Sequence, residues 1–183
     1  MEKFIKTYDN IISTKLESEI EHLVFHSGNF PVYYNHNNTY EGSQTSNPGL
    51  VHVFQRGDRL GSQFYHIFSP ILYTFCEKNN IEITNVYESR LFLDLPSPKE
   101  GPDLPPHTDK TYPHWVLLYY INSDAIGDTI FFDNNENEIE RISPKKGRIL
   151  FFDGSIKHCG SHSKTNSRGI INFNFIGNKK WNI

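Results

Sequence analysis

Three residues in the second half of the chain could together bind one metal ion: His107, Asp109 and His158. On an extended or loop backbone, residues i and i+2 point to the same side, so His107 and Asp109 can offer an imidazole and a carboxylate to one ion. This pair alone is a weak signal, because a turn after Pro105-Pro106 with a solvated or capping Asp109 accounts for it as well. His158 follows His107 by 51 positions and adds a second imidazole.

Two histidines and one carboxylate are the ligand set of non-haem Fe(II) sites, which keep open positions for other ligands. Arg168 follows His158 by ten positions, at the start of the last predicted strand. Its planar guanidinium matches a carboxylate with two parallel hydrogen bonds. A metal triad with a buried arginine suits a chelating dicarboxylic acid.

Short β runs must position these side chains. They are separated by turn residues, and many short strands with regular turns are typical of an all-β barrel or sandwich. The predicted strands cover residues 83–95, 115–121, 129–132, 138–142, 148–153 and 168–176. His158 then lies at a junction between two strands.

Two helices are predicted before these strands. Thr14 and Glu17 form a capping-box pattern, and apolar residues follow at helical spacing, so we expect a helix over residues 14–26. A second helix is expected near 62–78, with Pro70 as a kink or as the start of its second part.

The length of 183 residues indicates one domain over residues 1–183. We expect a helical and loop packing region over about 1–80 and a β-barrel core over about 81–176. The net charge of −3 leaves no basic surplus, so nucleic acid is not expected as a tightly held partner.

The two cysteines, Cys76 and Cys159, are too few for a disulfide framework and match no zinc-site spacing. We interpret both as free thiols of a reducing compartment. With no apolar signal core and no membrane span in the sequence, the prediction is a cytoplasmic protein without a membrane partner.

The order of these motifs resembles the 2-oxoglutarate/Fe(II)-dependent dioxygenases of the prolyl 4-hydroxylase-like superfamily. Residues 118–122 (LYYIN) look like the strand that follows HxD in prolyl hydroxylases. Residues 127–132 (GDTIFF) resemble their "GGxTxF" turn and strand, and residues 143–152 resemble the "xPxxGxxxxF" segment before the distal histidine. The resemblance covers about 85–176.

The resemblance implies a double-stranded β-helix, a jelly-roll or cupin-like barrel, preceded by N-terminal helices. His107, Asp109 and His158 would be the catalytic ligands of Fe(II). The implied reaction couples the oxidative decarboxylation of 2-oxoglutarate by O2, to succinate and CO2, with hydroxylation of a second substrate. The resemblance leaves room for ascorbate as an accessory reductant.

The same resemblance assigns the cosubstrate site. Arg168 would pair with the far carboxylate of 2-oxoglutarate, Tyr120 would donate a hydrogen bond to it, and Thr129 would assist from the neighbouring strand. The sequence departs from the family at Asp128, where a second glycine is common, and at Arg168, where many prolyl hydroxylases have lysine. The groups that bind the near end of the cosubstrate stay open; Arg90 lies in a strand from which it could face the cavity.

The substrate to be hydroxylated is expected to be a small molecule or a peptide, including free or peptidyl proline. Its choice would depend on loops around the barrel mouth, at about 27–60, 96–106 and 110–114. Two alternatives remain: a non-oxidative cupin-like barrel that binds a metal and a ligand, and an oxygenase that modifies nucleobases.

Overall fold

Two antiparallel sheets and two helices form within the part of the chain that the computed structural model describes, which is residues 4–36, 49–96, 105–123, 127–163 and 165–178. The elements in chain order are β1 (Ile5–Tyr8), α1 (Thr14–Phe25), β2 (Tyr33–Asn35), β3 (Gly49–Arg56), β4 (Arg59–Leu60), α2 (Tyr65–Lys78), β5 (Ile83–Asp94), β6 (Trp115–Tyr120), β7 (Thr129–Phe132), β8 (Glu138–Ile142), β9 (Ile149–Asp153), β10 (His158–Gly160) and β11 (Arg168–Gly177). The prediction of a mainly β chain with N-terminal helices is confirmed.

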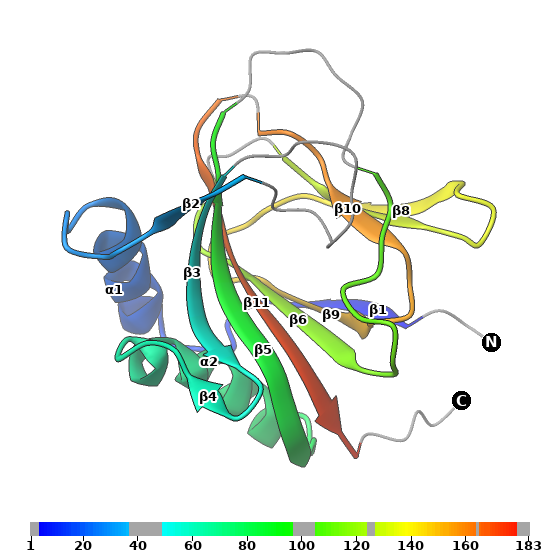
Figure 1. Ribbon diagram of the computed structural model, residues 1–183, viewed down its shortest axis with the longest axis horizontal. Helices are drawn as coiled ribbons and strands as arrows, with labels where there is room; N and C mark the ends of the chain where they lie inside the picture. Colours follow the sequence, from blue (N-terminus) through cyan, green and yellow to red (C-terminus); the bar gives the residue numbers. More distant parts are fainter. Residues whose placement is uncertain (1–3, 37–48, 97–104, 124–126, 164, 179–183) are drawn as a thin grey trace.

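From β6 onward the chain alternates between a large and a small sheet. The large sheet has the order β1-β9-β6-β11-β5-β3-β2, with β4 also paired to β3, and the small sheet has the order β10-β7-β8. After β6 the chain crosses to β7 and β8, returns to β9, crosses again to β10 and ends in β11. Figure 1 shows the large sheet as a curved layer, with both helices on one side and β8 and β10 on the other.

Alternate residues of the large sheet face two separate cores. In β5, Leu91 and Leu93 belong to the core that the helices cover, whereas Phe92 between them belongs to the core shared with Phe131 of the small sheet. Successive side chains of a strand point to opposite faces, which explains this division. The second face lines the interior between the sheets, and we call it the inner face.

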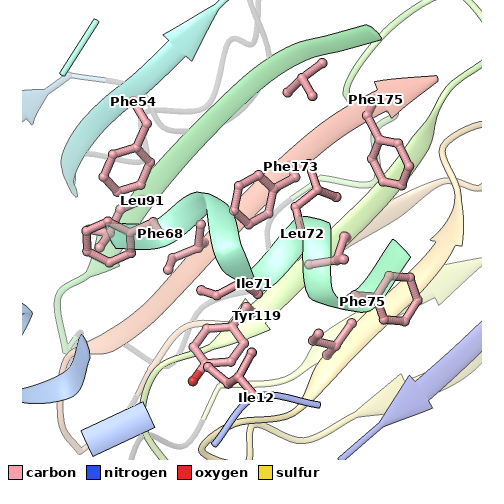
Figure 2. Close-up of a cluster of buried hydrophobic side chains, with 14 of the residues drawn as sticks. Ile12, Phe54, Phe68, Ile71, Leu72, Phe75, Leu91, Tyr119, Phe173 and Phe175 are labelled. Atoms are coloured by element: carbon pink, nitrogen blue, oxygen red, sulfur yellow. The ribbon is translucent and has the colours of Figure 1, made fainter. Parts of the chain in front are cut away.

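Helix α2 covers the outer face of the large sheet. Its buried stripe consists of Phe68, Ile71, Leu72 and Phe75, all with no exposed surface, and Figure 2 shows these side chains lying against the strands. Each fully buried side chain of this size contributes about 1.5–3 kcal/mol of hydrophobic stabilisation. The helix runs through Pro70 as one element. Neither helix in the described part is long and apolar enough to span a membrane.

The first turn of α1 is capped by a residue other than the predicted one. The side chain of Ser13 accepts a hydrogen bond from Leu16 N at 3.2 Å, and Thr14 is the first helical residue. The N-cap of α1 therefore lies one residue before the predicted position, at Ser13 instead of Thr14. Ser13 has extended backbone angles, which is the conformation that an N-cap requires.

We expect Ser13→Ala to lower the free energy of unfolding by about 1 kcal/mol, because the amide of Leu16 loses its acceptor. The matched variant Thr14→Ala removes an exposed hydroxyl with no capping role, and its effect should stay within about 0.5 kcal/mol. Urea unfolding of both variants measures the difference. Equal losses for the two would contradict this assignment of the cap.

Among the described residues of the first 80, where helices and loops were predicted, the structure has four strands. Strand β3 pairs along β5 and so extends the large sheet, while β1 pairs with β9 at the far edge. The polar residues His52 and Gln55 interrupt the apolar pattern of β3, so this strand was not predicted from the sequence. Parts of the predicted mouth loops, at 37–48 and 97–104, fall outside the described residues.

Candidate metal centre and its neighbouring cation

The two histidines of the predicted triad face each other across a β-bridge. The backbone N–H of His107 donates to the carbonyl of His158 at 3.0 Å, and the N–H of His158 donates to the carbonyl of His107 at 2.9 Å. Residues directly opposite in an antiparallel pair point to the same face. The two imidazole rings consequently lie with their centroids 5.1 Å apart.

Asp109 completes a compact set of ligand atoms. One oxygen, Oδ1, lies 3.8 Å from Nε2 of His107 and 3.7 Å from Nε2 of His158. One potential ligand atom from each of the three residues lies within 4.8 Å of the other two. The Nδ1 atoms of the histidines are each 3.1 Å from a backbone carbonyl, of Pro105 and of Ile156. Donation from Nδ1–H to these carbonyls would leave both Nε2 lone pairs for a metal.

The electrostatics of the triad suit metal binding. Burial lowers the pKa of His158 to about 4, so this imidazole is neutral at neutral pH. Burial alone would raise the pKa of Asp109, but the two imidazoles and the amide of Asn172 outweigh it and hold that pKa below its ordinary value. A neutral imidazole and an ionised carboxylate are the forms that ligate metals. The residues therefore fit a divalent ion such as Fe(II).

Asn172 orients the carboxylate of the triad. Its side-chain Nδ2 donates to Oδ2 of Asp109 at 2.8 Å, which leaves Oδ1 toward the histidines. Asn174 in turn donates from Nδ2 to Oδ1 of Asn172 at 3.2 Å. Asn172 was not identified from the sequence. Its position could have indicated a role, because Asn172 lies four residues from Arg168 on the last predicted strand and therefore shares the face of Arg168.

We expect Asn172→Ala to weaken Fe(II) binding by about 10- to 100-fold, the loss typical of a partner that orients a metal ligand. Anaerobic titration of the apo-protein with Fe(II) measures the dissociation constant. Asn174→Ala is the matched control, because Asn174 contacts Asn172 but makes no contact with Asp109 that the structure describes. Equal weakening by the two substitutions would contradict a direct role of Asn172.

Arg168 lies buried at the other end of the inner face of β11, only 2 % exposed. Its Nη1 donates to the carbonyls of Asp128 and Ser161 at 3.2 and 3.4 Å, and its Nε lies 3.8 Å from Oδ2 of Asp94. The guanidinium rests against Gly160, where an added Cβ would lie 3.0 Å from Nη1. Glycine at this position thus makes room for the cation.

The predicted cosubstrate residues Tyr120 on β6 and Thr129 on β7 pair with each other, and Tyr120 lies close enough to feel the charge of Arg168. The hydroxyl of Tyr120 donates to Oγ1 of Thr129 at 2.8 Å, and both residues are buried. Burial raises the pKa of Tyr120, and the positive charge of nearby Arg168 opposes this effect. Tyr120 is neutral at neutral pH and can donate a hydrogen bond.

The structure thus groups the predicted residues into two sets on one inner face. The first set contains His107, Asp109 and His158. The second set contains Arg168 with Tyr120 and Thr129. Asp94, which faces the cation across the β5–β11 pair, was not identified from the sequence. A lone aspartate at a strand end gives no signal of its own.

Comparison with known proteins supports the fold. No family model matches the chain, and no curated protein matches it. Among solved structures, an oxidoreductase of the 2OG-Fe(II) oxygenase family from Burkholderia pseudomallei superposes with a TM-score of 0.70 at 9% identity, covering 93% of this chain and 84% of that one.

Two prolyl hydroxylases also share the architecture. One is a prolyl-4-hydroxylase from Pseudomonas putida, with a TM-score of 0.64 and 12% identity over 94% of this chain and 92% of that one. The other is a prolyl hydroxylase from Trichoplax adhaerens, solved with a hypoxia inducible factor peptide fragment, with a TM-score of 0.64 and 15% identity over 94% of this chain and 83% of that one. The chain therefore has the double-stranded β-helix fold of the 2OG-Fe(II) oxygenases and prolyl 4-hydroxylases.

Proposed function

We propose that this protein is an Fe(II)- and 2-oxoglutarate-dependent dioxygenase that hydroxylates a small-molecule or peptidyl substrate, with peptidyl proline among the candidates. The observation that carries the proposal is a ligand triad and a buried guanidinium on one inner face of this barrel. The triad suits a divalent ion, and the guanidinium suits a carboxylate. 2-Oxoglutarate requires both groups, because it chelates a metal at one end and carries a carboxylate at the other.

His107, Asp109 and His158 would hold the iron. Bound Fe(II) would supply the oxidative chemistry, in which 2-oxoglutarate, O2 and a C–H bond give succinate, CO2 and an alcohol. The ring of Phe152 packs 4.8 Å from the ring of His158, and that of Phe131 lies 6.1 Å away. These rings would keep water from that side of the centre.

Arg168 would bind the distal carboxylate of 2-oxoglutarate. Its Nε has no hydrogen-bond partner in the described part of the chain, so the buried guanidinium keeps an unused donor for an anion. Tyr120 would add a second donor to the same carboxylate, because its hydroxyl can rotate away from Thr129. Asp94, 3.8 Å from Nε, would compete for the cation until the cosubstrate binds.

The buried cation also favours this proposal over a barrel that binds a metal without oxidation. A triad of this type alone would hold Zn or Ni equally well, whereas a guanidinium at 2 % exposure makes sense beside a dicarboxylate. The net charge of −3 argues against a nucleic-acid substrate that is held by its phosphates.

Succinate formation tests the proposal. The purified protein with Fe(II), ascorbate, 2-oxoglutarate and O2 should release succinate slowly even without a second substrate, and omission of iron, cosubstrate or O2 should stop the release. Screening amino acids and proline-containing peptides for faster release would then identify the substrate class. Succinate at the level of the iron-free control under all of these conditions would refute the proposed function.

A further inference from the structure

A cluster of charged side chains lies beside the candidate metal centre. Glu88 is buried, and three cations converge on its carboxylate: Arg56 at 3.0 Å, Arg90 at 3.3 Å and Lys110 at 2.8 Å. Burial alone would raise the pKa of Glu88, but the three cations outweigh it and lower that pKa. Glu88 is therefore ionised, and the cluster carries more positive than negative charge.

The register of the sheet places this cluster on the inner face. Arg90 lies opposite Asn172 in the β5–β11 pair, and Glu88 lies opposite Asn174. Directly opposite residues share a face, so Arg90 lies on the face from which Asn172 reaches Asp109. Arg90 also contributes to lowering the pKa of Asp109 through its charge.

The cluster and the buried cation lie at different positions along the inner face. On β11, Arg168 and Asn172 are four residues apart, about 13 Å along the strand. Asn172 contacts the triad and pairs with Arg90, whereas Arg168 pairs with Asp94 at the other end. A cosubstrate held by Arg168 would therefore leave the side of Arg90 for a second molecule.

The cations of the cluster are partly exposed, whereas its carboxylate is buried. The side chain of Glu88 is 4 % exposed, whereas those of Arg90 and Lys110 are 20 % and 25 % exposed. The guanidinium of Arg90 lies over the ring of Phe92 at 4.8 Å, which restricts its motion. A restrained cation loses little entropy when it binds a ligand.

Two buried polar atoms in this region have no partner in the described part of the chain. They are Nε of Arg90, a donor, and Oδ1 of Asn174, an acceptor. Unpartnered buried polar atoms are rare in folded proteins and call for an explanation. An anion at the cluster would accept from Nε of Arg90, and water that the anion retains would donate to Oδ1 of Asn174, after a small shift of the side chains.

We propose that Arg90 and Lys110 form the subsite for an anionic group, a carboxylate or a phosphate, of the molecule that the enzyme oxidises. The identification of this molecule as the substrate rests on the proposed function, whereas anion binding at Arg90 and Lys110 does not depend on it. If both hold, the substrate is a small molecule or a peptide that carries an anionic group near the reacting carbon.

Nuclear magnetic resonance of the labelled protein tests the subsite directly. Acetate and inorganic phosphate are titrated separately at constant ionic strength, and the signals of Arg90 Nε–H and of the Asn172 and Asn174 side-chain amides are followed. We expect saturable shifts with millimolar half-saturation. The anion that binds more tightly indicates whether the natural group is a carboxylate or a phosphate.

Variants show where the anion binds. Arg90→Gln and Lys110→Gln should each weaken anion binding about tenfold, the loss expected for one charge-assisted hydrogen bond, as read from the amide signals. Arg141→Gln and Lys15→Gln, which remove cations from β8 and α1, are the matched controls and should leave binding unchanged. Shifts that do not saturate, or that all four variants weaken alike, would overturn the proposal.

The anion titration is then repeated in the presence of Zn(II) and saturating 2-oxoglutarate. This experiment distinguishes a substrate subsite from a cosubstrate site. Anion binding at Arg90 should persist in this complex. Displacement of the anion by 2-oxoglutarate would overturn the inference, because Arg90 would then be a cosubstrate residue. Anion binding without any succinate formation in the oxygenase assay would instead refute the oxygenase and leave the subsite standing.

Discussion

Replacement of His107 or Asp109 by alanine is expected to lower iron- and 2-oxoglutarate-dependent succinate formation by more than about a hundredfold. That factor is the upper range for partners that merely orient metal ligands, and loss of a ligand itself should cost more. Each substitution removes one of the three atoms that the β-bridge and Asn172 bring together. The measurement is the initial rate of succinate release at saturating iron.

The matched control is His66→Ala, which removes an exposed imidazole on α2 far from the triad in sequence. It should keep full activity. Circular dichroism of the apo-proteins should be the same for all variants, because His107 makes its β-bridge through backbone atoms, which alanine keeps. Full activity of His107→Ala or Asp109→Ala would remove the triad from the chemistry.

Replacement of Arg168 by alanine is expected to raise the concentration of 2-oxoglutarate required for half-maximal rate by about a hundredfold. Loss of one partner of a buried, hydrogen-bonded charge pair costs about 2–5 kcal/mol, and each 1.4 kcal/mol is a factor of ten. Binding of Fe(II) to the apo-protein should be unchanged, since Arg168 makes no described contact with the triad.

Two further variants separate this role from a structural one. Arg168→Lys keeps the charge without the planar fork and should recover part of the affinity for 2-oxoglutarate. Arg168→Ala with Asp94→Asn removes both charges of the pair, which guards against misfolding by a stranded carboxylate. Arg59→Ala, on the exposed β4, is the control. An unchanged cosubstrate requirement in Arg168→Ala would exclude its assigned role.

The strands of the second half could be predicted from the sequence because turn residues bound them sharply. Strands β5, β6, β7, β8, β9 and β11 fall within one residue of the predicted ranges. Their order and spacing also carried the resemblance that gave the fold. By contrast, β10 has three residues, too few for any pattern, and its pairing with β7 depends on the folded barrel.

The site was predictable in its ligand types but not in its supporting contacts. His107, Asp109 and His158 are chemically distinctive residues with a telling spacing, and the structure brings them together. The β-bridge between the histidines forms between residues 51 positions apart, so no local pattern reports it. The same holds for Arg56 and Lys110, which are distant from Glu88 in the sequence and meet it only in the folded chain.

Anaerobic addition of Fe(II) and 2-oxoglutarate to the apo-protein tests whether the triad and Arg168 bind iron and cosubstrate together. We expect a weak visible charge-transfer band that requires both components, that is lost in Asp109→Ala, and that disappears with release of succinate when O2 is admitted. No band in the wild-type protein, together with tight binding of Zn(II) or Ni(II), would refute an oxygenase and leave a metal-binding barrel that shares only the fold of the oxygenases.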